Sequence, residues 1–231
     1  MNPLLRHKYA ILLAALIGAA LVESFSHGQV LSPALSDLAI GTILLLVFLI
    51  VFTRRVNRLV AFLAWAAVVV AQGARYLLPG ASEAPLQLLY HSAVLLLAGY
   101  ATLVILRNIF EQRVVRVDDV LGSVCGYLLA ALAWSNLFML IEIFLPGSFS
   151  VGSGFGAGGD SWHARIAVLH NVSLGSLTSL GSGAVVPVRA PATMLTTLEA
   201  VFGQFYIAVV VAQLVGARLS QALQRNRAPE A

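Results

Sequence analysis

Residues 162–187 read WHARIAVLHNVSLGSLTSLGSGAVVP and lie between two long apolar stretches of the chain. From Trp162 to Thr178 about half of the residues are apolar, and scattered polar side chains interrupt them. This segment is too short to cross a hydrocarbon core, which needs roughly 20 residues of helix. A glycine-rich run, 179–183, follows it. The pattern predicts a short re-entrant helix, because irregular backbone is tolerated at membrane depth only beside water or inside protein.

The composition indicates that the whole chain is a membrane protein. Of its 231 residues, 59% are hydrophobic and only 10% are charged, whereas soluble chains average about 25% charged residues. The single cysteine, Cys125, lies in an apolar stretch, so it excludes an intrachain disulfide and favours core packing. Six apolar blocks predict six membrane-spanning helices: Lys8 to Val22, Leu38 to Phe52, Leu59 to Leu78, Leu86 to Leu106, Val120 to Leu145 and Ala192 to Leu219.

The basic residues sort by loop when six helices are threaded alternately across the bilayer. Eleven of the 14 Lys and Arg residues then fall on one side, and only Arg75, Arg165 and Arg189 fall on the other. Removing any one helix spoils this sorting. Because cytoplasmic loops carry an excess of Lys and Arg, we expect a multi-pass protein of the inner (plasma) membrane with both termini in the cytoplasm. The net charge of +4 therefore indicates orientation in lipid and no nucleic-acid partner.

A cleaved signal peptide is an alternative for the first block. Arg6 to Lys8 would form its basic start, and Gly18 to Ala20 would supply a small-residue cleavage site. Cleavage would leave five helices and would disturb the sorting of the basic residues, so the spanning interpretation is favoured.

The segment quoted above resembles the two-helix pore module of the potassium channel superfamily. Residues 172–187, VSLGSLTSLGSGAVVP, compare without gaps to the family's usual FSFVTLTTVGYGDIVP, and Thr178, Gly181, Gly183 and Pro187 match. Residues 198–206, LEAVFGQFY, are similar to the inner helix of bacterial members. The resemblance implies an all-α pore domain with an outer helix, a pore helix, a filter loop and an inner helix, in a homotetramer around a central pore.

The chemistry of conduction explains why a filter needs these residue types. A dehydrated cation regains oxygen ligands from rings of backbone carbonyls, and alternating glycines allow successive carbonyls to face one axis. The negative end of the short helix also favours a cation. The resemblance implies that the ion-binding residues are Thr178, Ser179, Leu180, Gly181, Ser182 and Gly183. It places K⁺ at Ser179, Leu180, Gly181 and Ser182, with the Ser179 hydroxyl as a further, innermost ring.

Three positions depart from the family's pattern. Ser179 replaces a threonine, Ser182 an aromatic residue that packs behind the filter, and Ala184 an aspartate that ties the outer mouth to the pore helix. We therefore expect a less rigidly held filter with weak selectivity, K⁺ or Na⁺ as the permeant ion, and no cofactor. Ala184 and Glu199 are the predicted filter-support positions, and Gly203 takes the place of the gating hinge of the inner helix.

The charged connection between Arg107 and Asp119 divides the chain into two predicted domains, 1–116 and 117–231. The first is a four-helix membrane domain, and the second is the pore domain. The fourth block lacks an arginine at every third place and has only Arg107 at its end. Because voltage sensing needs several charges in the field, we expect the four-helix domain to be insensitive to voltage.

Ionisable residues inside apolar blocks are candidate sites by default. Glu142 and Arg75 lie near the outer ends of their helices, so we expect their side chains to extend to the interface. His91 is a further candidate. Gln204 and Gln213 are expected to line an inner cavity or to hydrogen-bond between helices.

Alternative functions leave different signals. A rhomboid-like serine protease needs a G-x-S-G motif and a later histidine, but position 180 is Leu and no histidine follows His170; no enzyme is expected. A secondary transporter needs a mirrored broken helix in the first half, and no glycine-interrupted short segment is found there. A non-conducting channel homologue that acts as an accessory or scaffold protein remains open, since the family's Tyr and Asp are absent from the filter.

Overall fold

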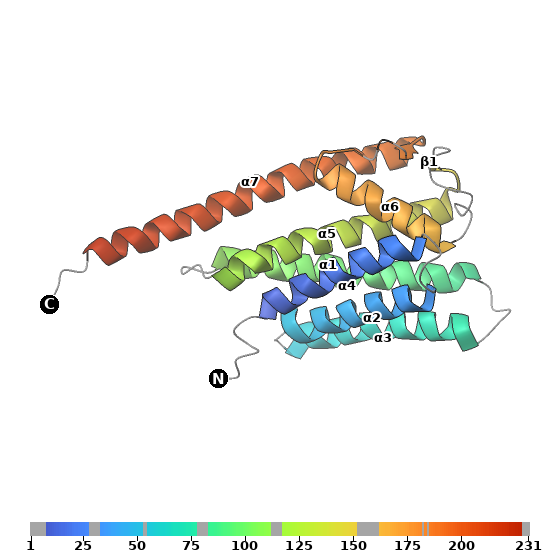
Figure 1. The fold of residues 1–231 in the computed structure, drawn as a ribbon, viewed down its shortest axis with the longest axis horizontal. Helices are drawn as coiled ribbons and strands as arrows, with labels where there is room; N and C mark the ends of the chain where they lie inside the picture. Colours follow the sequence, from blue (N-terminus) through green and yellow to red (C-terminus); the bar gives the residue numbers. More distant parts are fainter. Residues whose placement is uncertain are drawn as a thin grey trace.

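The computed structural model is a bundle of long helices with one short helix and a small sheet at one end (Figure 1). It describes residues 8–27, 33–52, 55–77, 83–111, 117–151, 162–181, 183 and 185–227. In chain order the elements are α1 (Lys8–His27), α2 (Pro33–Val51), α3 (Arg55–Leu77), α4 (Glu83–Glu111), α5 (Val117–Phe144), β1 (Phe149–Val151), α6 (Trp162–Leu177), β2 (Val185–Pro187) and α7 (Ala190–Arg227).

Apolar helices of membrane-spanning length confirm the membrane assignment. Four described segments are long and apolar enough to cross a bilayer: Arg58–Arg75, Ala84–Glu111, Val117–Phe144 and Ala190–Gln221. α1 and α2 carry shorter apolar stretches, Lys8–Val22 and Ile40–Val51. α1 begins and α7 ends at the same end of the bundle (Figure 1). Six spans, and the side of the membrane that holds the termini, stay predictions.

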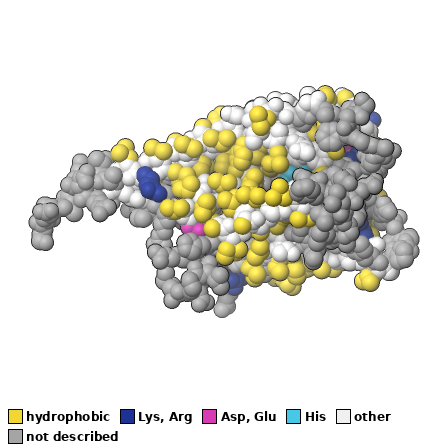
Figure 2. Space-filling model, in the orientation of Figure 1, with side chains coloured by type: hydrophobic (Ala, Val, Ile, Leu, Met, Phe, Trp, Pro, Cys, Tyr) yellow, Lys and Arg dark blue, Asp and Glu magenta, His cyan; other side chains and the backbone are white. Residues whose placement is uncertain are grey.

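Hydrophobic side chains form a broad band over the middle of the surface, whereas Lys and Arg lie toward the ends of the bundle (Figure 2). α7 contributes strongly to this surface. Its side chains are exposed on one stripe at helical spacing, formed by Met194, Leu198, Val201, Phe205 and Val209, and on a second formed by Ile207, Val211 and Val215. A water-soluble helix keeps one apolar stripe and buries it. The exposed stripes of α7 therefore require lipid or another protein surface.

Close packing joins α5 to helices of the first part of the chain. α5 lies against α4 and α1, and small residues on α5 allow this contact. A Cβ on Gly122 would lie 3.0 Å from the Tyr9 ring of α1, and one on Gly126 would lie 3.2 Å from Cγ2 of Ile105 on α4 and 2.6 Å from the Tyr206 hydroxyl of α7. Cys125 is fully buried and its Sγ lies 3.4 Å from the Tyr9 carbonyl, so its prediction as a packing residue is confirmed.

A second apolar cluster joins the elements of the predicted pore domain. It contains Phe138, Met139, Phe149, Val168, Leu169, Val172, Val185 and Ala192. These residues come from α5, β1, α6, β2 and α7, so one core fixes all five elements relative to one another. The rings of Phe138 and Phe149 lie 5.3 Å apart within it.

The two-stranded sheet was not predicted. β1 and β2 pair antiparallel, with Phe149 opposite Pro187, Ser150 opposite Val186 and Val151 opposite Val185. Each strand has only three residues, which is too short for an alternating pattern to be recognised in the sequence. The sheet connects the segment after α5 to the segment that precedes α7.

Candidate functional site

α6 enters the bundle from the end that carries β1 and stops partway along α5 and α7 (Figure 1). Its 16 residues make a helix about 24 Å long at 1.5 Å per residue, shorter than a hydrocarbon core of about 30 Å. The predicted helix, Trp162 to Thr178, agrees with the observed one within a residue. The chain then returns toward the same end and continues into β2. This path of the chain is the one expected of a re-entrant helix, whose place in a membrane stays a prediction.

The end of α6 lies deep within the bundle. The hydroxyl of Tyr127 donates to the carbonyl oxygen of Leu177, the last residue of α6, at 2.8 Å. Gly203 lies against the same carbonyl: a Cβ on Gly203 would be 2.0 Å from that oxygen. Tyr127 and Gly203 both lie near the middle of the spans Val117–Phe144 and Ala190–Gln221. The end of α6 is therefore at the depth of the middle of α5 and α7.

Polar contacts also fix the middle of α6. The hydroxyl of Ser173 is fully buried and lies 2.7 Å from the Ala131 carbonyl of α5 and 2.5 Å from the Glu199 carboxyl of α7. Glu199 is itself fully buried. It was predicted to support the filter from behind; in the structure its side chain contacts Ser173 of α6, and a role at a filter stays a prediction. Ser173 and Tyr127 were not singled out in the sequence.

The backbone after α6 carries the features expected of residues 178–183. Ser179, Gly181 and Gly183 have positive φ angles of 59°, 76° and 35°, so left-handed conformations recur at every second residue. Thr178, Ser179, Leu180, Gly181 and Gly183 are all exposed, and Leu180 is 85% exposed. Ser182 and Ala184 lie outside the described residues.

The first residues of this run form a turn over the end of α6. The amides of Thr178, Ser179 and Gly181 donate to the carbonyls of Leu174, Ser176 and Gly175 at 3.1, 3.0 and 3.0 Å. The carbonyls of residues 178–181 are different, because none of them accepts a hydrogen bond from another described residue. The amides of Thr178, Ser179 and Gly181 are thus satisfied within the described part of the chain, whereas the carbonyls of these exposed residues are free of hydrogen bonds to it.

Gln204 connects α7 to this run. Its side-chain amide donates to the Ser179 hydroxyl at 2.9 Å, and both residues are exposed. The expected hydrogen bond between helices is not the one observed, because Ser179 lies just after the end of α6; the lining of an inner cavity by Gln204 stays a prediction. Gln213 is partly buried on the same helix.

Gly203 has a clear packing role. It is buried, and α7 is helical without a break from Ala190 to Arg227. The absence of a side chain lets the Leu177 carbonyl approach the backbone of α7. Its role as a gating hinge stays a prediction.

Two intramembrane candidates make buried polar contacts. His91 of α4 lies with its Nδ1 2.6 Å from Oδ1 of Asn136 on α5, and both residues are buried. Glu142 is only 7% exposed. Its carboxylate is occupied by backbone amides and by Arg165. The expectation that Glu142 extends to the interface was wrong, because the chain that follows α5 folds back over it.

Comparison with protein-family models, with curated proteins and with solved structures finds no match to this chain.

Proposed function

We propose that four copies of this chain form a cation channel similar to potassium channels, with residues 178–183 lining its axis. K⁺ or another monovalent cation passes down its gradient through rings of backbone carbonyls. α5 is the outer helix, α6 the pore helix and α7 the inner helix of each subunit. The four-helix domain, 1–116, surrounds this pore in the membrane.

One observation supports the proposal above all others: the carbonyls of residues 178–181, which accept no hydrogen bond from another described residue, belong to exposed residues next to the end of α6, at the depth of the middle of α5 and α7. Burying one such group in hydrocarbon without a hydrogen bond costs roughly 2–7 kcal/mol. Four of them would cost roughly 8–28 kcal/mol, as much as or more than the roughly 5–15 kcal/mol by which a whole domain is stable. Water, cations or another protein surface must therefore satisfy these carbonyls, and a carbonyl-lined pore does so with water and cations.

The four-fold arrangement follows from the geometry of a carbonyl filter. One chain supplies one strand of carbonyls, and a cation needs oxygens on all sides. The two exposed apolar stripes of α7 support such an assembly, because one stripe can contact a neighbouring subunit while the other faces lipid. A closed ring of identical subunits satisfies both surfaces.

Ion flux into proteoliposomes tests the proposal. Gly181→Ala is the informative variant, because Gly181 has a φ of 76° and a side chain there costs about 1–2 kcal/mol in the left-handed conformation. Gly216→Ala is the matched control, since Gly216 lies in α7 with no atom within 4 Å of an added Cβ. We expect K⁺ flux from the wild type and from Gly216→Ala, and a strong reduction in Gly181→Ala.

The oligomeric state separates a channel from a non-conducting homologue. Native mass spectrometry of the purified protein is expected to give a tetramer for the wild type and for both variants. A tetramer without flux would favour a scaffold or accessory role. A monomer without flux would contradict the pore assembly itself.

A further inference from the structure

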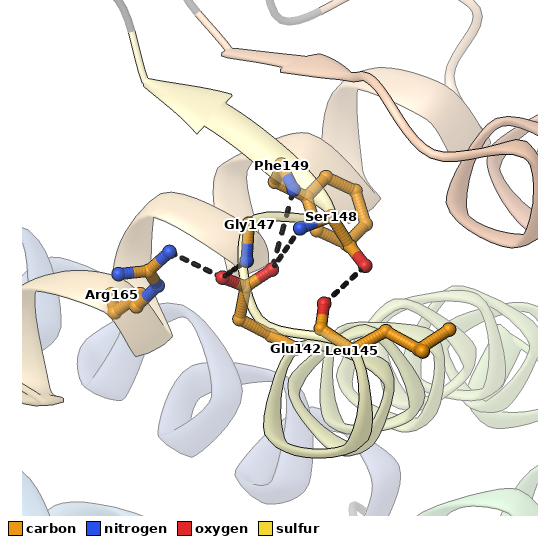
Figure 3. Close-up of polar contacts among 6 residues, drawn as sticks. All are labelled: Glu142, Leu145, Gly147, Ser148, Phe149 and Arg165. Carbon is orange, nitrogen blue, oxygen red and sulfur yellow. Dashed lines mark hydrogen bonds and ion pairs between the residues drawn. The ribbon is translucent and has the colours of Figure 1, made fainter.

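The carboxylate of Glu142 gathers four donors at the outer end of α5 (Figure 3). Oε1 accepts from the amide of Gly147 at 2.9 Å and from the guanidinium of Arg165. Oε2 accepts from the amides of Ser148 at 3.0 Å and Phe149 at 3.3 Å. Consecutive amides that converge in a turn form an anion-binding concavity. Glu142 thus holds the turn after α5 and the first turns of α6 at the same time.

The turn at residues 147–149 is in contact with residues 185–189, which follow the filter. The carbonyl of Ser148 accepts from the amides of Val188 at 2.9 Å and Arg189 at 3.4 Å. Phe149 begins β1, which pairs with β2 at Val185 to Pro187. Gly183 is only two residues before β2. Hydrogen bonds therefore lead from Glu142 to β2, which begins two residues after Gly183.

We propose that Glu142 is a positioning residue for the outer end of the filter, and that Arg165 is its counter-ion on the pore helix. The inference rests on the proposed channel function. The aspartate that ties the outer mouth to the pore helix in the resembled family is replaced here by Ala184. In this chain the outer helix performs that task through the turn 147–149 and the β1–β2 sheet.

The chemistry of the side chain is specific to a carboxylate. An ionised carboxylate is acceptor-only and accepts up to four bonds, whereas the amide of a glutamine has one acceptor oxygen and adds two donor hydrogens. Glu142→Gln keeps the size of the side chain. Its NH₂ group, however, would face other hydrogen-bond donors, either the amides of Ser148 and Phe149 or the Gly147 amide and the Arg165 guanidinium. β1 is then no longer held in place by Glu142, and neither is β2, which pairs with it.

The rate at which a disulfide forms between β1 and β2 reports whether Glu142 holds the two strands in place, and it requires no conduction. Ser150 and Val186 are directly paired and both exposed. Paired Cα atoms in antiparallel strands lie about 4.5–5.5 Å apart, which is within the range that a disulfide bridges. The experiment uses the full-length protein with Ser150→Cys, Val186→Cys and Cys125→Ala, and follows disulfide formation under a mild oxidant. We expect Glu142→Gln to slow the reaction at least about tenfold, relative to the same background with Glu142 intact.

Glu111→Gln is the matched control, because Glu111 pairs with Arg107 at 2.6 Å in an exposed position at the other end of the bundle. It should leave the rate of disulfide formation unchanged. Arg165→Lys serves as a milder variant and should give an intermediate rate if Glu142→Gln fails to assemble. Equal rates in the Glu142 and Glu111 variants would overturn the proposal.

Recording from the same proteins tests the link to the filter. Glu142→Gln is expected to move the K⁺ to Na⁺ permeability ratio toward one, and the preformed 150–186 disulfide is expected to restore it. A merely structural role for Glu142 would change the amount of assembled protein and leave that ratio unchanged in the channels that remain. If disulfide formation is slowed but the protein never conducts, Glu142 does hold β1 in place and the proposed channel function is wrong. Conduction with an unchanged ratio would reject the link between Glu142 and the filter.

Discussion

Gly203→Ala places a methyl group against the backbone of α6. The added Cβ would lie 2.0 Å from the Leu177 carbonyl oxygen, 2.9 Å from its carbon and 3.1 Å from its Cα. An ordinary contact begins near 3.4 Å, so the end of α6 and the middle of α7 must separate by about 1.4 Å. The neighbour is backbone and no rotamer change can relieve the clash.

The expected cost follows from two destabilising terms and one stabilising term. Overpacking of this kind costs about 1–3 kcal/mol, and separation of the helices also loses the bond from Tyr127 to Leu177, which contributes about 1 kcal/mol. Alanine in place of glycine favours the helix by about 1 kcal/mol. We therefore expect Gly203→Ala to destabilise the assembled protein by about 1–3 kcal/mol. Gly216→Ala has the helix term alone and should stabilise it slightly.

Thermal unfolding in detergent, followed by loss of the oligomer on gels, measures the difference between the two variants. The packing interpretation predicts a lower midpoint for Gly203→Ala than for Gly216→Ala. A hinge at Gly203 predicts a different result, namely an altered open probability with unchanged stability. Equal midpoints for the two variants would refute the packing argument and favour the hinge.

Two further substitutions test the hydrogen bonds made at the end of α6 and at the start of the 178–183 run. Tyr127→Phe removes the hydroxyl that donates to Leu177; we expect a loss of about 1–3 kcal/mol in the same unfolding assay because the buried carbonyl loses its partner, and an unchanged midpoint would contradict this role. Gln204→Leu removes the donor to the Ser179 hydroxyl; we expect a changed unitary conductance with little change in stability, since both residues are exposed, and conductance identical to that of the wild type would show that the contact has no effect on conduction.

Helix positions could be predicted from the sequence because apolar length is a local property. The fifth block, Val120 to Leu145, and the pore helix, Trp162 to Thr178, agree with α5 and α6 within a few residues at each end. The last block was predicted to end at Leu219, whereas α7 continues to Arg227. A helix can extend beyond the hydrocarbon core, and hydropathy does not record that extension.

The support of the filter could not be predicted in the same way because it depends on long-range contacts. Three of the four groups that donate to Glu142 are backbone amides of residues 147–149, and backbone amides cannot be recognised in a sequence. The β1 strand, FSV, and the β2 strand, VVP, are too short to be recognised separately. Gly203 was assigned by resemblance alone, and only the position of the Leu177 carbonyl shows why a side chain is excluded there.

Single-channel recording of the purified protein in planar bilayers, with K⁺ on one side and Na⁺ on the other, tests the central claim most directly. The account predicts unitary cation currents, with a reversal potential between zero and the K⁺ equilibrium value because the Ser182 and Ala184 positions depart from a selective filter. Silence from intact tetramers, while a control channel conducts and Ser182→Tyr with Ala184→Asp restores nothing, would contradict it.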